Sequence, residues 1–195
     1  ISGGFSWLPV FSMGIAAQGI ASLEADTNHD TRIFTLALLI SSLFVYNSMG
    51  TIDENALSNL SLVVNLTQHI HTRANPINGE EDGTEFSQFF PSFLWVLRDF
   101  TLRLENNGEP MSSREYLEKS LEPVKGHSDT IESKNRIRRM LSGFFENRDC
   151  FTLVRPVNDE GLLQALDKAD AGQLRPEFVE ASNRLRARVW KSSPL

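Results

Sequence analysis

Arg98 and Asp99 form a charged pair at the end of the apolar stretch FFPSFLWVL (89–97), whose pattern is typical of a buried β-strand. In open α/β sheets, ligands bind at the carboxyl ends of the strands. An aspartate there can accept two hydrogen bonds from a base with two adjacent donors, which guanine offers and adenine does not. The pair therefore indicates a guanine-recognition site. The alternative is an aspartate that caps a turn and pairs with the arginine, which is the more common use of such a dipeptide.

Other residues capable of chemistry give weaker signals. His69 and His71 are two positions apart on an expected helix, so they point away from each other and make a poor pair of metal ligands. Four cations in residues 134–139 are typical of a solvated helix face, with contact to phosphates or a partner as the alternative. Cys150 starts an expected strand and is predicted to be buried and inert. No metal site is expected from these residues.

Charge and composition exclude several classes of protein. Residues 1–97 contain nine acidic and two basic residues, whereas residues 98–195 contain sixteen acidic and seventeen basic ones. Neither half has the basic face expected of a nucleic-acid-binding protein. The most apolar run, 33–45, is too short to span a bilayer, so no transmembrane segment is expected. The single cysteine excludes an internal disulfide and favours a cytoplasmic location, with membranes reached only through partners.

Short apolar strands alternate with amphipathic helices along the chain, which predicts an α/β fold with a mostly parallel sheet flanked by helices. Strands are expected over 42–49, 92–98 and 149–156, with a weaker candidate near 8–13. Helices are expected over 30–41, 53–72, 112–121, 129–145, 160–169 and 176–191. Capping boxes mark two of the helix starts, Thr51 with Glu54 and Ser112 with Glu115.

Three stretches together resemble the guanylate-binding protein family of large, dynamin-related GTPases. They are TRIFTLALLISSLFVYNSMGTIDENAL (31–57), FFPSFLWVLRDFTLRL (89–104) and RDCFTLVRP (148–156). The likeness covers residues 19–190, in the order and spacing of the family. The resemblance implies a partial Ras-like GTPase domain with a helical C-terminal segment. It also implies that the chain binds GTP or GDP and that the reaction is GTP hydrolysis.

The resemblance also assigns roles to single residues. In that family an Arg-Asp pair at a strand end is the guanine-specificity motif, and this role carries over to Arg98 and Asp99. The segment at Arg155 and Pro156 would begin the loop that caps the guanine and helps two GTPase domains to pair. The implied partners are therefore a guanine nucleotide and either a second copy or an intact family member.

The phosphate-binding residues of the family have no match in the sequence. No Gly-x-x-x-x-Gly-Lys-Ser/Thr motif occurs, and the first lysine is Lys119. The family's Asp-x-Glu-Gly motif falls on residues 16–19, where Gly19 alone remains as a phosphate-side remnant. Magnesium is expected for the family, but its ligands are missing, and no catalytic residue is assigned. Because phosphoryl transfer depends on positioning and charge neutralisation, we expect GTP hydrolysis by this chain to be impaired. Residues 1–195 are expected to form a single GTPase domain that is incomplete at its N-terminus, with residues 1–18 atypical of the family.

Two further interpretations stay open. A non-catalytic interaction or dimerisation module would need no phosphate-binding lysine. A truncated gene product is favoured by the poor match of residues 1–18 to the family.

Overall fold

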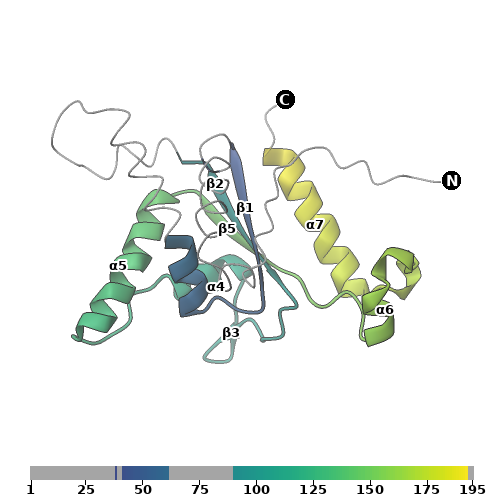
Figure 1. The fold of residues 1–195 in the computed structure, drawn as a ribbon, viewed down its shortest axis with the longest axis horizontal. Coiled ribbons are helices and arrows are strands. Elements are labelled where there is room, and N and C mark those ends of the chain that lie inside the picture. The colour runs from purple at the N-terminus through teal and green to yellow at the C-terminus, as the bar shows by residue number, and fades with distance from the viewer. Residues whose placement is uncertain (1–37, 39–40, 62–89, 193–195) are drawn as a thin grey trace, which may run out of the picture.

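The computed structural model describes residues 38, 41–61 and 90–192 (Figure 1). In this part of the chain, strands β1 (Leu43–Met49), β2 (Ser92–Arg98) and β5 (Arg148–Thr152) form a sheet in the order β1-β2-β5. Both pairings are parallel. The predicted class, an α/β fold with a parallel sheet and helices on its faces, is therefore confirmed.

The central strand β2 explains the long apolar stretch in the sequence. Residues 93–97 are all buried, because helices cover both faces of the sheet. Phe93, Trp95 and Leu97 belong to the core on one face, and Leu94 and Val96 belong to the core on the other. A strand buried on one face would alternate apolar and polar residues, so the unbroken run itself indicates a central position.

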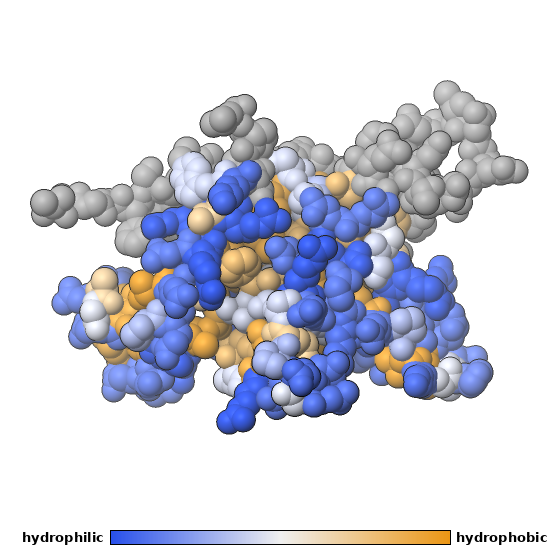
Figure 2. Space-filling view, turned by 180° about the vertical axis from the view of Figure 1, so that it is seen from behind, coloured by the Kyte–Doolittle hydropathy of each residue, from blue (hydrophilic) through white to orange (hydrophobic). Residues whose placement is uncertain are grey.

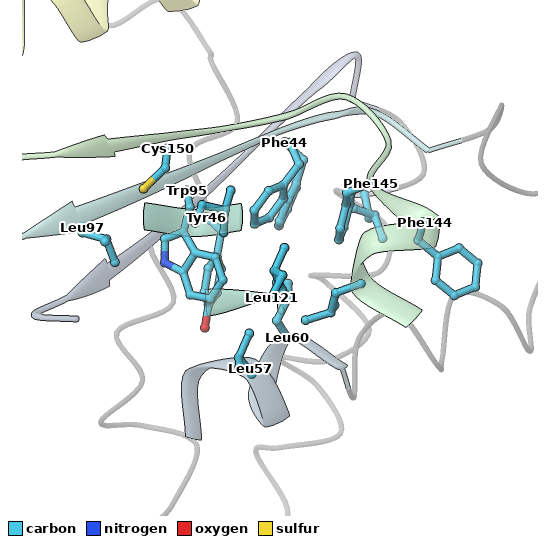
Figure 3. Packing of buried hydrophobic residues seen from close by; sticks show 14 of the residues in the cluster. Phe44, Tyr46, Leu57, Leu60, Trp95, Leu97, Leu121, Phe144, Phe145 and Cys150 are labelled. Atoms are coloured by element: carbon cyan, nitrogen blue, oxygen red, sulfur yellow. The ribbon is translucent and has the colours of Figure 1, made fainter. Parts of the chain in front are cut away.

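The larger core lies between the sheet and a helical segment at 54–61, α4 (Ser113–Ser120) and α5 (Asp129–Phe144). Figure 3 shows its aromatic side chains, with Trp95 beside Tyr46 on neighbouring strands. Trp95 is fully buried, and its indole Nε1 donates to Ser48 Oγ at 2.9 Å, so its polar atom is satisfied.

Helix α7 (Pro176–Ser192) covers the opposite face (Figure 1). Its first residue is a proline, which suits a helix start because the missing N–H would have no partner there. Ala181 packs into the second core together with Val45 and Leu94. Near the end of α7, Arg188 Nε lies 3.5 Å from Asp149 Oδ2 at the beginning of β5. The helix therefore runs antiparallel to the strands and returns from their carboxyl ends.

The two predicted capping boxes have different outcomes. The box of Ser112 and Glu115 is confirmed at the start of α4. The box of Thr51 and Glu54 is wrong, because the helical segment begins at Glu54 and Asp53 Oδ1 accepts from Ala56 N at 2.7 Å.

Glu54 instead forms two hydrogen bonds with the guanidinium of Arg138 on α5. Arg138 is only 6% exposed, so the predicted solvated cationic face is wrong at this residue. The guanidinium also lowers the pKa of Glu54, through a hydrogen bond and through its charge. The ion pair therefore joins α5 to the helical segment that follows β1.

Several boundaries differ from the sequence expectation. The third strand ends at Thr152 rather than at Pro156. The helix expected over 160–169 divides into α6 (Glu160–Gln164) and the 3₁₀ helix η1 (Leu166–Lys168), and a second 3₁₀ helix, η2 (Ala171–Gln173), follows.

A small hairpin of β3 (Glu105–Asn106) and β4 (Glu109–Pro110) was not expected from the sequence. Its signal is Asn107-Gly108, a dipeptide that favours two-residue turns, and both residues have positive φ, at 52° and 86°.

Some sequence expectations concern residues outside the described ranges. They are the phosphate-side remnant Gly19, the histidines at 69 and 71, the strand near 8–13 and most of the helix over 30–41. Within the described ranges, no helix is both long and apolar enough to cross a bilayer. The surface seen in Figure 2 is largely hydrophilic, with apolar colour in separate patches.

Candidate functional site

The carboxyl ends of β1, β2 and β5 meet at one edge of the sheet, because these strands are parallel. Main-chain hydrogen bonds join the segments that leave this edge. Gly50 N donates to the carbonyl oxygen of Arg98 at 2.7 Å, and Phe100 N donates to that of Leu153 at 3.0 Å. The Arg-Asp pair therefore lies between the segments that follow β1 and β5, which is the usual position of ligand sites in such folds.

Asp99 occupies a left-handed backbone conformation, with φ of 51°. Few non-glycine residues adopt this conformation, although aspartate and asparagine do so more readily than most. The hydrogen bonds of the Arg98 carbonyl and the Phe100 N–H hold the peptide groups on either side of the turn. Such a conformation persists when its surroundings impose it, and it is often found at ligand sites.

The Asp99 side chain is half-buried, and its carboxylate has no hydrogen bond or ion pair with any residue in the described ranges. Its two oxygens can therefore accept hydrogen bonds from a ligand. The bond to Arg98 that the alternative interpretation required is not formed.

Arg98 bonds to a neighbouring strand instead of to Asp99. Its side chain is exposed, and its Nε donates to Asn47 Oδ1 on β1 at 3.0 Å. The pair thus consists of an anchored cation and a carboxylate available to a ligand, which can provide donors and acceptors to the same molecule.

Arg155 and Pro156 begin an excursion that returns to its starting point. Pro156 O accepts from Arg175 N at 2.8 Å, so the ends of residues 157–174 lie close together. Arg155 forms an ion pair with Glu160 at 2.8 Å, in the first turn of α6. Val157 is the only residue of this excursion that is buried, so the excursion contributes little to the core.

Tyr116 on α4 contacts both segments beside Asp99. Its hydroxyl oxygen accepts from Ile52 N at 3.2 Å, and its ring lies edge-on to Phe100 with the centroids 5.4 Å apart. Burial raises the pKa of the Tyr116 hydroxyl, so the phenol stays neutral across the physiological range. The tyrosine therefore helps to fix the turn that presents Asp99.

The described part of the chain has no group of three or more His, Cys, Asp or Glu side chains able to hold a metal ion. No step through magnesium is derived from the described residues. Cys150 is buried as predicted, and burial raises the pKa of its thiol to about 12, which makes it a poor nucleophile.

Sequence reasoning missed two contributors to this edge, Asn47 and Tyr116. Asn47 is a polar residue within the apolar run SLFVYNSM (42–49), and that interruption was a usable signal. No local pattern points to Tyr116, because its contact with Ile52 spans 64 positions of the chain.

Comparison with known proteins adds independent information. Residues 13–194 match the family model described as "Guanylate-binding protein, N-terminal domain". The chain is 44% identical to human guanylate-binding protein 6 over 168 residues, which is 85% of this chain and 26% of that protein. It is 42% identical to human guanylate-binding protein 1 over 167 residues, 84% of this chain and 28% of that protein. The mouse guanylate-binding protein 6 is 41% identical over 167 residues. The chain therefore spans about a quarter of the length of these relatives.

Proposed function

The chain belongs to the guanylate-binding protein family, and we propose that it binds guanine nucleotides at the carboxyl edge of its sheet, as part of a GTPase domain that extends over residues 1–195. The names of the relatives support guanine nucleotides as the ligand class. The parallel sheet with helices on both faces supports the choice of its carboxyl edge.

The observation that carries the proposal is the state of Asp99. Its backbone is held in a left-handed turn by bonds on both sides, and its carboxylate has no partner among the described residues. Guanine presents its ring N–H and its 2-amino group side by side, so one carboxylate can accept from both. Adenine presents an acceptor in place of the ring N–H, which would leave the carboxylate facing a lone pair. Asp99 would therefore select guanine over adenine.

Arg98 and the excursion after β5 would complete the base site. Arg98 carries a positive charge beside Asp99 and would support the bound guanine. The excursion that begins at Arg155 and Pro156 would lie over the base and limit its contact with water. Only one residue of this excursion is buried, and segments with few buried contacts open more readily than the core. Such a cap would open to release one nucleotide and admit the next.

We further propose that the 195 residues alone hydrolyse GTP slowly. The sequence contains no Gly-x-x-x-x-Gly-Lys-Ser/Thr motif, and the described residues include no group of three or more His, Cys, Asp or Glu side chains that could hold a metal ion. Phosphoryl transfer obtains most of its acceleration from such groups. Phosphate release from GTP should therefore remain close to the uncatalysed rate when the chain is incubated with GTP and magnesium. Release at the rates usual for GTPases would refute this part of the proposal.

A second candidate function is association with another domain of the same family through the carboxyl edge. Two large apolar side chains next to the site favour it, because Met49 is 63% exposed and Leu102 is 53% exposed. Met49 ends β1 opposite Arg98, so the apolar surface adjoins the nucleotide site. Sedimentation velocity of the chain, alone and mixed with an intact family member, tests this. Unchanged sedimentation with and without nucleotide would count against it.

Calorimetric titration of the purified chain with GTP, GDP and ATP tests the main proposal. We expect binding of GTP and GDP, none of ATP, and loss of guanine binding in Asp99→Asn. Asp129→Asn is the matched control, since Asp129 is an exposed aspartate in the first turn of α5. Equal binding of ATP and GTP, or no binding of any nucleotide, would overturn the proposal.

A further inference from the structure

The anchor of Arg98 is a neutral side chain on the neighbouring strand. Register pairs Asn47 with Val96 and Met49 with Arg98, so Asn47 and Arg98 are diagonal neighbours on one face of the sheet. Arg98 Nε donates to Asn47 Oδ1 at 3.0 Å. Because Asn47 lies within β1, its own backbone is fixed by the sheet, and it provides a rigid point of attachment.

This anchor leaves most of the binding capacity of the arginine available. Arg98 has no ion pair in the ranges that the structure describes, and Nε is its only nitrogen with a hydrogen-bond partner there. Its terminal nitrogens keep four N–H donors for a ligand. An acidic anchor at position 47 would neutralise the positive charge, whereas an amide holds the guanidinium without reducing its charge.

We propose that Asn47 is a positioning residue of the guanine site, which acts on the nucleotide only through Arg98. This inference rests on the proposed function. A free arginine side chain samples many rotamers and loses that freedom when a ligand binds. Asn47 lowers the entropy that Arg98 loses when a nucleotide binds, because one guanidinium nitrogen is already held at the strand end before binding.

A double-mutant cycle tests the inference. GDP affinity is measured by calorimetry for the full chain and for the variants Asn47→Ala, Arg98→Ala and the combination of both. We expect Asn47→Ala to weaken GDP binding by about three- to tenfold, the range for one hydrogen bond. In the Arg98→Ala background, the same change should alter the GDP affinity by less than about twofold, because the guanidinium that Asn47 positions is absent.

A matched control separates this role from a structural one. Asn147 lies at the opposite edge of the sheet, and its Nδ2 donates to Ser92 Oγ at 2.7 Å, also between neighbouring strand segments. Asn147→Ala should lower the melting temperature about as much as Asn47→Ala does and leave GDP affinity unchanged. Equal losses of affinity in both asparagine variants would mean that Asn47 only supports the fold.

The remaining outcomes are also decisive. An unchanged affinity in Asn47→Ala, or an equal loss with and without Arg98, overturns the inference. If Asp99→Asn abolishes binding while Asn47→Ala does not weaken it, the proposed function stands and the inference fails. If the unmodified chain binds no guanine nucleotide, both fail.

Discussion

Exchange of Asp99 for asparagine should change the base preference of the chain from guanine to xanthine. Xanthine carries an oxygen where guanine carries the 2-amino group, and it keeps the ring N–H. The asparagine oxygen would still accept from the ring N–H, and the new amide N–H would donate to the xanthine oxygen. With guanine, the same amide would face the 2-amino group, donor against donor.

The magnitude follows from the unpartnered state of the carboxylate. Because Asp99 has no other bond within the described ranges, both of its oxygens are available, and each hydrogen bond to a charged group contributes about 1.5–3 kcal/mol. Losing one of them and leaving a donor unpaired should cost about 3 kcal/mol, which is a loss of about 100-fold or more in GDP affinity. Asparagine tolerates the left-handed conformation at φ 51° as well as aspartate does, so the fold should be unchanged.

The assay is calorimetric titration of the unmodified chain and Asp99→Asn with GDP and xanthosine diphosphate, alongside thermal unfolding. The unmodified chain should prefer GDP, and the variant should prefer xanthosine diphosphate by about tenfold or more. Asp129→Asn should retain the preference of the unmodified chain. A variant that keeps its melting temperature yet loses both nucleotides equally, or keeps GDP, would refute the hydrogen-bonding scheme.

Three other predictions concern stability and reactivity. Tyr116→Phe should lower the unfolding free energy by about 1 kcal/mol and weaken GDP binding, since it removes the bond to the segment after β1; urea unfolding that is unaltered would contradict this. Glu54→Gln should lower the unfolding free energy by about 2 kcal/mol at pH 7, because it leaves buried Arg138 without its counter-charge. This value is reduced from that of a fully buried pair, because the Glu54 side chain is 41% exposed and solvent screens its charge. Arg138 lowers the pKa of Glu54, so this stabilisation is present above the unfolded pKa of about 4.3 and is lost as the pH falls through the folded pKa. A difference in unfolding free energy between the unmodified chain and Glu54→Gln that persisted below the folded pKa would argue against the ion pair. Cys150 should react with iodoacetamide at pH 8 only after unfolding, because burial raises its thiol pKa to about 12, and rapid labelling of the folded chain would contradict its burial.

Local sequence patterns predicted the three strands of the described sheet and the position of the Arg-Asp pair at its carboxyl edge. The apolar run of β2 predicted a buried strand, because only a strand covered on both faces can be apolar at every position. The charged pair that ends it was predicted to lie at a carboxyl edge, and the structure places it there. The capping box at Ser112 was also predicted, since its bonds join residues only three positions apart.

The sequence by itself thus determined the α/β class, the buried strand that ends in the charged pair, and the position of Arg98 and Asp99 at its carboxyl end. Only the tertiary structure decided what each charged group contacts. Arg98 bonds to Asn47 across 51 positions rather than to its neighbour Asp99, and Glu54 bonds to Arg138 across 84 positions rather than capping its own helix. The physical reason is that a side chain forms the bond with the better geometry among all groups that folding brings near it. Sequence periodicity describes only neighbours on one helix or strand, so partners from distant segments, and the left-handed turn they help to hold at Asp99, appear only once the sheet has formed.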